Sequence, residues 1–401
     1  MKNPSKFLGN ELEYLKKVLH SDSWSATGGS WTEKLELEFA EKFESEYAIA
    51  FNSGTSTMHA ALLAFGIEPG DEVISPALTV IMNTSSTIHA NAVPVYADIN
   101  PKTFSIDPSD IERKITPKTK AINVVSIYGL PCDMDPIMNL AKKHNLFVLE
   151  DNAECFLSRY KSKMTGTFGD MASYSFEDSK HLSCGEGGML ITSNEDLALK
   201  ARKVGNHGFK NLQSASGRIK QDLNVFQNPM YKRHDTIGWN YRLPEFNSAI
   251  ALAQLERLDE LVDYRVKTAE IFIDIMKECD FLIPQRTPNC CTNSYWALGV
   301  KYEGEKAIGL SWEDFRLEYI KAGGDGFYGA WSVPYLEPVM QERNFVKLNP
   351  EIYNNIKFEK GICPNAEEIQ KKLMVFKTNY RSLDLAEQKA DALKKIIMKY
   401  K

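Results

Sequence analysis

The segment from Ser175 to Gly188 contains a lysine that could react as a nucleophile with an aldehyde. Lys180 follows a short apolar run and precedes the glycine-rich turn that starts at Gly185. A loop of this kind can hold an amine in a partly desolvated pocket, where its pKa falls toward neutrality and its electron pair becomes available. Most lysines are solvated surface charges, so this segment alone leaves the role of Lys180 open.

A possible phosphate cradle precedes this lysine in the sequence. Gly54 and Thr55 lie in the run Phe51–Ser56, between a predicted strand and the helix that follows it. A glycine there allows the backbone to approach an anion closely, and the following helix offers unpaired N–H groups and a positive dipole end. An ordinary turn that caps a helix has the same composition, so both interpretations remain open.

A third candidate group is the carboxylate of Asp151, which ends the apolar run that starts at Leu146. An ionised aspartate beside a pyridine nitrogen raises the pKa of that nitrogen and keeps it protonated, which makes the ring an electron sink. The alternative is that Asp151 only terminates its strand.

The elements around these residues follow an alternating pattern of strands and helices, which is typical of a parallel α/β sheet. Strands are predicted at 48–52, 72–75, 93–98, 121–127, 146–150, 172–176 and 189–193, with helices at 56–65 and 135–144. Such a sheet collects its ligand-binding groups at the carboxyl ends of its strands. The three candidate groups all fall at or just beyond such ends.

The sequence pattern from residue 206 onward predicts a long loop and a second domain. Residues 206–236 are polar and without clear periodicity, and a loop this long is usually functional or contacts a partner. One long amphipathic helix is predicted from Ala249 onward. We therefore expect a large domain at 1–259, which includes an N-terminal helical segment, and a small α+β domain at 260–401.

Composition excludes several classes of protein. The 401 residues are 43% hydrophobic and 25% charged, with a formal net charge of −5, which gives no indication of a nucleic-acid or membrane partner. The seven cysteines form no CxxC pair, so neither a metal site nor a disulfide framework is expected. The sequence shows no signal peptide and no membrane-spanning run, so we expect a cytoplasmic protein.

The ordered set of motifs resembles the DegT/DnrJ/EryC1/StrS family of sugar aminotransferases, which depend on pyridoxal 5′-phosphate (PLP). The motifs are SGT at 53–55, ED at 150–151 and SFxxxKxxxxGEGG at 175–188; further matching segments are 70–74, 115–122, 128–129, 133–135, 238–242 and 251–255. The resemblance implies the aspartate-aminotransferase fold, PLP fold type I. This is an α/β fold with a large domain, whose mostly parallel mixed sheet is flanked by helices, and a smaller C-terminal α+β domain.

The resemblance also implies roles for single residues. Lys180 occupies the Schiff-base position, and Asp151 matches the aspartate that pairs with the pyridine nitrogen of PLP. The phosphate ligands correspond to Gly54, Thr55 and Ser175. Asn240 matches an asparagine that reaches the phosphate from the neighbouring subunit, which implies a homodimer with shared active sites.

Three positions depart from the pattern of the family. Glu154 stands where glutamine is frequent, near the phenolic oxygen O3′ of the cofactor. Val80 stands where an aromatic ring usually stacks on the cofactor, and an aliphatic side chain covers the ring face without quadrupole interactions. The segment from Gly323 to Trp331 does not match the commoner substrate-site pattern, which leaves the identity of the sugar open.

The implied reaction is transfer of an amino group from glutamate or glutamine to a keto-sugar. A nucleotide-linked keto-6-deoxyhexose is the expected acceptor, and the amino sugar would serve a glycan such as lipopolysaccharide O-antigen or a secondary metabolite. The alternatives are the same reaction on a cyclitol or other small ketone, a sugar 3-dehydratase, and a non-catalytic PLP-fold protein. The dehydratases carry histidine in place of the lysine, and here His181 lies one position beyond it.

Overall fold

A seven-stranded sheet forms the centre of the protein in the computed structural model, which describes residues 3–219 and 221–401. Its strand order is β1-β9-β8-β5-β4-β2-β3. The strands are β1 (Tyr47–Phe51), β2 (Glu72–Pro76), β3 (Val93–Ala97), β4 (Thr119–Val125), β5 (Phe147–Asp151), β8 (Met171–Ser175) and β9 (Gly188–Thr192). Only β9 pairs antiparallel with its neighbours, β1 and β8; the remaining pairs are parallel. The predicted mostly parallel mixed sheet is confirmed.

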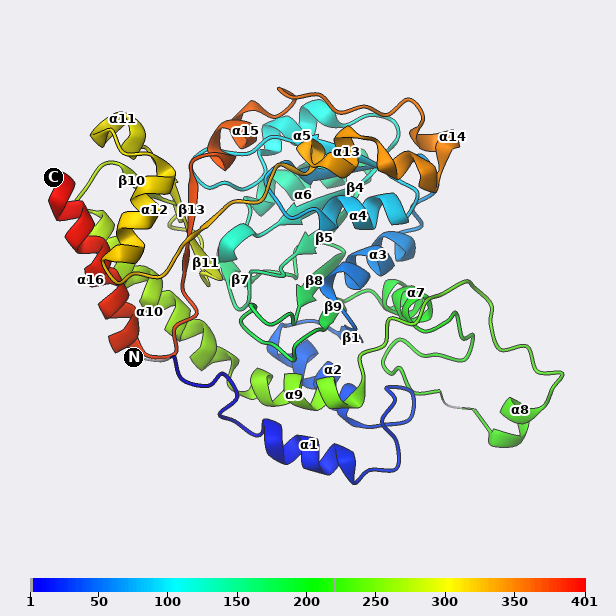
Figure 1. Ribbon diagram of the computed structural model, residues 1–401. Coiled ribbons are helices and arrows are strands. Elements are labelled where there is room, and N and C mark those ends of the chain that lie inside the picture. Colours follow the sequence, from blue (N-terminus) through cyan, green and yellow to red (C-terminus); the bar gives the residue numbers. More distant parts are fainter. Residues whose placement is uncertain (1–2, 220) are drawn as a thin grey trace.

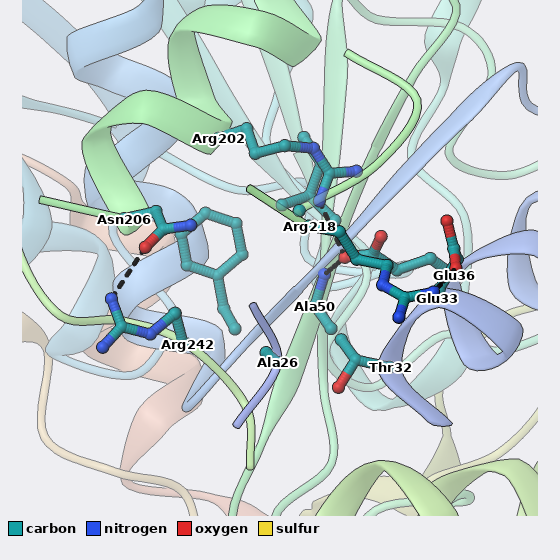
Figure 2. A pocket seen from close by; sticks show the side chains of 13 residues that line it. Ala26, Thr32, Glu33, Glu36, Ala50, Arg202, Asn206, Arg218 and Arg242 are labelled. Carbon is teal, nitrogen blue, oxygen red and sulfur yellow. Dashed lines mark hydrogen bonds and ion pairs between the residues drawn. The ribbon is translucent and has the colours of Figure 1, made fainter. Parts of the chain in front are cut away.

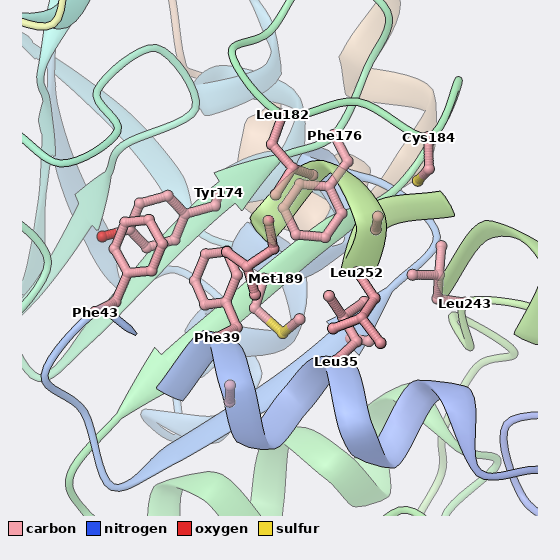
Figure 3. Packing of buried hydrophobic residues seen from close by; sticks show 14 of the residues in the cluster. Leu35, Phe39, Phe43, Tyr174, Phe176, Leu182, Cys184, Met189, Leu243 and Leu252 are labelled. Atoms are coloured by element: carbon pink, nitrogen blue, oxygen red, sulfur yellow. The ribbon is translucent and has the colours of Figure 1, made fainter. Parts of the chain in front are cut away.

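Helices cover both faces of this sheet (Figure 1). They include α2 (Trp31–Lys42), α3 (Gly54–Ala64), α4 (Met82–His89), α5 (Pro108–Lys114), α6 (Met134–His144), α7 (Glu195–Gly205) and α9 (Glu245–Glu256). On one face Leu35 and Phe39 of α2 pack with Met189 of β9 and Leu252 of α9, as Figure 3 shows. On the other face, the side chains of α3 and α7 pack over β1 and β9. Both faces of the central strands are therefore buried, as their continuous apolar runs predict.

The second, smaller sheet is antiparallel, with strand order β10-β11-β13-β12. Its strands are β10 (Leu282–Pro284), β11 (Ala297–Tyr302), β12 (Tyr328–Gly329) and β13 (Leu373–Lys377), and its helices are α10 (Leu258–Met276), α11 (Gly304–Ile308), α12 (Trp312–Lys321) and α16 (Leu383–Tyr400). Phe272, Phe376 and Leu393 are buried in the core between sheet and helices. This confirms the smaller C-terminal α+β unit.

The single long helix expected from Ala249 is wrong: the structure has two helices, α9 and α10, that meet at Arg257. The backbone of Arg257 leaves the helical region, with φ −109° and ψ 10°. Helix α9 packs against α1 (Glu11–Leu19) and α2, whereas α10 packs against α16 and reaches the small sheet. The apolar periodicity continues across the break, so it does not reveal that the two halves cover different cores.

Residues 334–370 return from the small sheet to the large one. This segment holds α13 (Pro338–Gln341), α14 (Pro350–Tyr353), α15 (Pro364–Gln370) and the 3-10 turns η2 (Pro334–Leu336) and η3 (Asn344–Leu348). The hydroxyl of Tyr353 donates to the carbonyl oxygens of Ile88 and Ala92, both at 3.0 Å. The division of the chain at residue 260 stays a prediction, because this later segment packs on the large sheet.

The described residues of the loop 206–236, which are 206–219 and 221–236, extend away from the body of the protein and carry the short helix α8 (Leu223–Gln227) (Figure 1). A buried ion pair lies at its base, where Arg202 contacts Glu36 at 3.0 Å (Figure 2). Arg202 also donates to the carbonyl oxygen of Ser214 at 3.1 Å. Arg242, nearby, donates to the amide oxygen of Asn206 at 2.7 Å. The small cavity of about 30 Å³ between these side chains is thus part of the loop's attachment.

Within residues 3–219 and 221–401, no helix combines the length and the apolar composition that crossing a membrane requires.

Candidate active site

A cavity of about 350 Å³ opens at the carboxyl ends of β4, β5 and β8, beside the start of α3. Seven of the eight candidate residues line it: Gly54, Thr55, Val80, Asp151, Glu154, Ser175 and Lys180. They come from positions as far apart as 54 and 180, so the parallel strand order brings them together. The location is the one at which open α/β sheets bind ligands.

The eighth residue, Asn240, is not part of this cavity. It is exposed, it pairs with Asn206 in an isolated bridge, and its carbonyl oxygen accepts from the Asn52 amide at 3.5 Å. Within one chain, Asn240 therefore lies apart from Lys180, and its role stays a prediction.

The start of α3 has the features of an anion site. The Ser53 hydroxyl caps the helix by accepting from the backbone N–H of Ser56 at 3.1 Å, and the N–H groups of a helix's first turn have no partner within the helix. A Cβ on Gly54 would lie 3.0 Å from the Cβ of Ser175, so the missing side chain lets α3 approach the end of β8. A phosphate at this helix start would meet both free N–H groups and a positive dipole end.

Asp151 presents a buried carboxylate at the end of β5. One of its oxygens accepts from the Asn83 amide at 2.9 Å and the other accepts from the backbone N–H of Ala153 at 3.1 Å. Burial raises the pKa of Asp151, while the two donors and the nearby Lys180 ammonium favour its ionised form. A cationic ring nitrogen would offset the desolvation of this carboxylate.

Lys180 forms an ion pair with Glu154 inside the cavity, with 3.3 Å between Nζ and Oε1. Both side chains are nearly buried, at 12% and 7% exposure. The second oxygen of Glu154 accepts from the backbone N–H of Tyr128 at 3.0 Å. Burial raises the pKa of Glu154, and the Lys180 ammonium opposes that shift. The Lys180 side chain is therefore fixed at the wall of the cavity by a nearly buried carboxylate.

Two tryptophan rings, Trp296 and Trp331, line the cavity, and of these Trp296 lies in none of the segments that the sequence motifs marked. Lys180 Nζ lies 4.3 Å from the centre of the Trp296 ring, and the Trp296 indole N–H donates to the carbonyl oxygen of Ser179 at 3.0 Å. Tyr128, Trp296 and Trp331 are nearly parallel, with centroids 5.9 to 6.4 Å apart. Trp296 lies 116 positions beyond Lys180, so no local signal in the sequence connects the two.

Tyr128 reaches these rings through an unusual backbone conformation. Its φ of 60° is in the left-handed region, which is costly for a bulky residue. Gly299 makes room for the ring, because a Cβ there would lie 2.7 Å from Tyr128 Cδ2. Strain of this kind concentrates at functional sites, which agrees with the position of Tyr128 beside Glu154.

Two further residues hold the lysine loop from behind. Arg265 of α10 is buried and donates to the carbonyl oxygens of Ser179 at 2.7 Å and Lys180 at 3.2 Å. His181 turns away from the cavity: its Nε2 lies 2.9 Å from the Ser294 carbonyl oxygen, and burial places its pKa well below the ordinary value. His181 therefore does not occupy the place of the lysine.

These residues fit PLP, the cofactor that the motifs imply. The start of α3 suits its phosphate, the Asp151 carboxylate suits its ring nitrogen, and the Lys180 amine suits its aldehyde. Val80 lines the same cavity and supplies an aliphatic surface where the family usually has an aromatic ring.

Comparison with known proteins gives the same assignment. The model of the DegT/DnrJ/EryC1/StrS aminotransferase family matches residues 7–311. A GDP-perosamine synthase from Escherichia coli O157:H7 is 42% identical over 264 residues, which are 66% of this chain and 68% of that protein. An L-glutamine:2-deoxy-scyllo-inosose aminotransferase from Micromonospora echinospora is 33% identical over 75% of this chain and 71% of its own. The structure of an aminotransferase from Psychrobacter cryohalolentis superposes with a TM-score of 0.87 at 28% identity, covering 100% of this chain and 99% of the other.

Proposed function

The chain belongs to the DegT/DnrJ/EryC1/StrS aminotransferase family, and on this premise we propose that it transfers the amino group of glutamate or glutamine to a nucleotide-linked keto-6-deoxyhexose. The protein is a PLP-dependent sugar aminotransferase, so the proposal concerns the donor and the acceptor. The nearly buried Lys180 amine, which shares one cavity with Asp151 and the start of α3, supports the transamination chemistry itself. The similarity to a GDP-perosamine synthase supports a nucleotide-linked acceptor.

The residues of the chain divide the work of this reaction. When bound, PLP supplies an aldehyde that accepts the amino group and a ring that spreads negative charge. Asp151 would keep the ring nitrogen protonated, because its carboxylate is fixed by Asn83 and Ala153 and removed from water. The start of α3, with Gly54 and Thr55, would hold the phosphate.

Lys180 would anchor the cofactor and, once released by the donor, move the proton at the substrate carbon that bears the nitrogen. Glu154 accepts a hydrogen bond from the Lys180 ammonium and can keep that side chain in one orientation. The Trp296 ring, whose centre lies 4.3 Å from the same ammonium, adds a cation–π contact.

A cyclitol acceptor is the second candidate, because a relative named for scyllo-inosose amination is 33% identical to this chain. A 3-dehydratase activity has less support, because the lysine is present and His181 is hydrogen-bonded to the Ser294 carbonyl oxygen instead of facing the cavity. The intact set of lysine, aspartate and helix start argues against a non-catalytic protein.

We also infer a homodimer in which Asn240 completes the site of the partner subunit. Asn240 lies outside its own cavity, and two apolar side chains that precede it in the sequence, Met230 and Ile237, are 75% and 81% exposed. Association that covers these side chains would bury apolar area and would carry the loop 206–236 toward a second chain.

Absorption spectroscopy tests the first half of the proposal. We expect the wild-type protein with PLP to show a visible band from the lysine-linked cofactor, which glutamate or glutamine converts to a band at shorter wavelength. The Lys180→Ala variant should lack the visible band, whereas Lys161→Ala, which removes an exposed lysine, should keep it. A protein that binds PLP and responds to neither donor would refute the proposed donor. A panel of keto-sugar nucleotides and scyllo-inosose, followed by mass spectrometry, then separates the two acceptors.

A further inference from the structure

A second cavity, of about 530 Å³, adjoins the active-site cavity. Ser179, Trp296 and Trp331 line both, so these three residues form the wall between them. Trp296 is fixed by its hydrogen bond to Ser179, while Trp331 is 40% exposed at the rim. A ligand longer than a sugar ring would reach the second cavity from the Lys180 side by passing over the exposed edge of Trp331.

The second cavity offers two partly exposed aromatic rings, one of which, Trp331, also stacks on Trp296. Tyr328 is 61% exposed and lines this cavity with Trp331. Single exposed aromatic rings are ordinary, but two that line one cavity beside an active site provide faces on which a planar base can stack. Both belong to the segment 323–331, which departs from the commoner pattern of the family.

The same cavity is electropositive. Arg265 and Lys377 line it, and its lining, all of it in the described part of the chain, contains no aspartate or glutamate. Arg265 donates to backbone carbonyl oxygens and to the Thr378 hydroxyl. None of these acceptors is a carboxylate, so these hydrogen bonds do not neutralise its charge. Lys377 Nζ lies 3.9 Å from Asp325, whose other oxygen pairs with Lys389 at 2.9 Å. A phosphate in this cavity would meet cations that are not fully neutralised.

We propose that the second cavity binds the nucleoside diphosphate of the substrate, with the base against Tyr328 and Trp331 and the diphosphate toward Lys377. This inference rests on the proposed function, because it requires the sugar to lie on the Lys180 side of the wall. The volume of the cavity falls in the range of about 300–1,000 Å³ that ligand pockets occupy. A cyclitol has no nucleotide and would leave this cavity unused.

Calorimetric titration of the PLP-loaded enzyme with GDP and UDP, a purine and a pyrimidine probe, tests the proposal. We expect at least one nucleotide to bind. Tyr328→Ala and Trp331→Ala should each weaken binding by about tenfold or more, which is the range for loss of a base–aromatic stack. Lys377→Ala should weaken binding and flatten its dependence on salt. The matched controls Trp24→Ala, at an exposed tryptophan outside the cavity, and Lys372→Ala, at a lysine just before β13 that pairs with Glu303, should bind as the wild type does.

The proposal is overturned if neither nucleotide binds, or if the three variants bind as tightly as the two controls. The reaction of the wild-type enzyme with the amino donor is followed separately by its absorption spectrum and decides the proposed donor alone. Nucleotide binding that depends on Tyr328, Trp331 and Lys377 would support the cavity assignment even if the donor proved to be another amino acid.

Discussion

The ion pair between Lys180 and Glu154 gives a prediction about stability that can be worked from its geometry. At 3.3 Å and an effective dielectric constant of about 20, the attraction between the two charges is about 5 kcal/mol. Desolvation of the two groups cancels much of this attraction, because both side chains are nearly buried. Removing one partner, however, leaves the other as a buried and uncompensated charge, which typically costs about 3–5 kcal/mol.

We therefore expect Lys180→Met and Glu154→Gln to destabilise the PLP-free protein by about 2–4 kcal/mol each, and the double variant by less than the sum of the two. The free energy of unfolding is measured by urea denaturation of the wild type, both single variants and the double variant. The expected coupling energy is about 1–3 kcal/mol. Exposed pairs give less, typically about 0–1 kcal/mol, so Lys161→Met with Asp135→Asn, at an exposed pair, serves as the control cycle.

The loss of stability that Lys180→Met causes should depend on pH. Burial raises the pKa of Glu154 above its unfolded value, and the loss of the lysine removes the ammonium that opposes this shift. A carboxyl with a raised folded-state pKa binds more protons in the folded state, so stability falls as pH rises through that pKa. The free energy of unfolding of the variant should accordingly be closer to that of the wild type at pH 5 than at pH 8. Additive single variants, or a pH dependence of the opposite sign, would refute the ion-pair reasoning.

Three further predictions follow from other parts of the site. Asp151→Asn should weaken PLP binding by about tenfold or more, because a charge-assisted bond to the ring nitrogen is lost; absorbance titration measures this, with Asp135→Asn as the control. Gly54→Val should weaken PLP binding with little loss of helix content, since even a Cβ there lies 3.0 Å from the Cβ of Ser175; unchanged affinity would contradict the role of the α3 start. Burial lowers the pKa of His59 to about 4, so between pH 7 and pH 5 this histidine becomes protonated in the unfolded state but not in the folded state. The free energy of unfolding of the wild type should therefore fall by about 2 kcal/mol over this range, and that of His59→Phe should not. Urea denaturation of both proteins at the two pH values tests this difference.

The sequence alone determined the central sheet and much of the candidate site. Each strand is a short apolar run between turn signals, and the motifs follow the ends of these runs. The local sequence therefore predicts that Gly54, Asp151 and Lys180 lie at or just beyond the ends of strands. The local sequence does not predict the antiparallel direction of β9 or the break at Arg257, because both depend on which distant surfaces pack together. The apolar periodicity around Arg257 is the same whether one core or two lie beneath it.

Only the tertiary structure decided the surroundings of the reactive groups. Asn83 bonds Asp151 from 68 positions away, Trp296 covers Lys180 from 116 positions away, and Arg265 holds the lysine loop from α10. The motifs around Lys180 indicate that a lysine can react, but its ion pair with Glu154 requires β5 and β8 to lie side by side, and Trp296 reaches it only from the segment just before β11 of the small sheet. Local sequence encodes backbone period and turn chemistry, whereas contacts between distant segments depend on the order of the strands and on the side chains that fill the space between them.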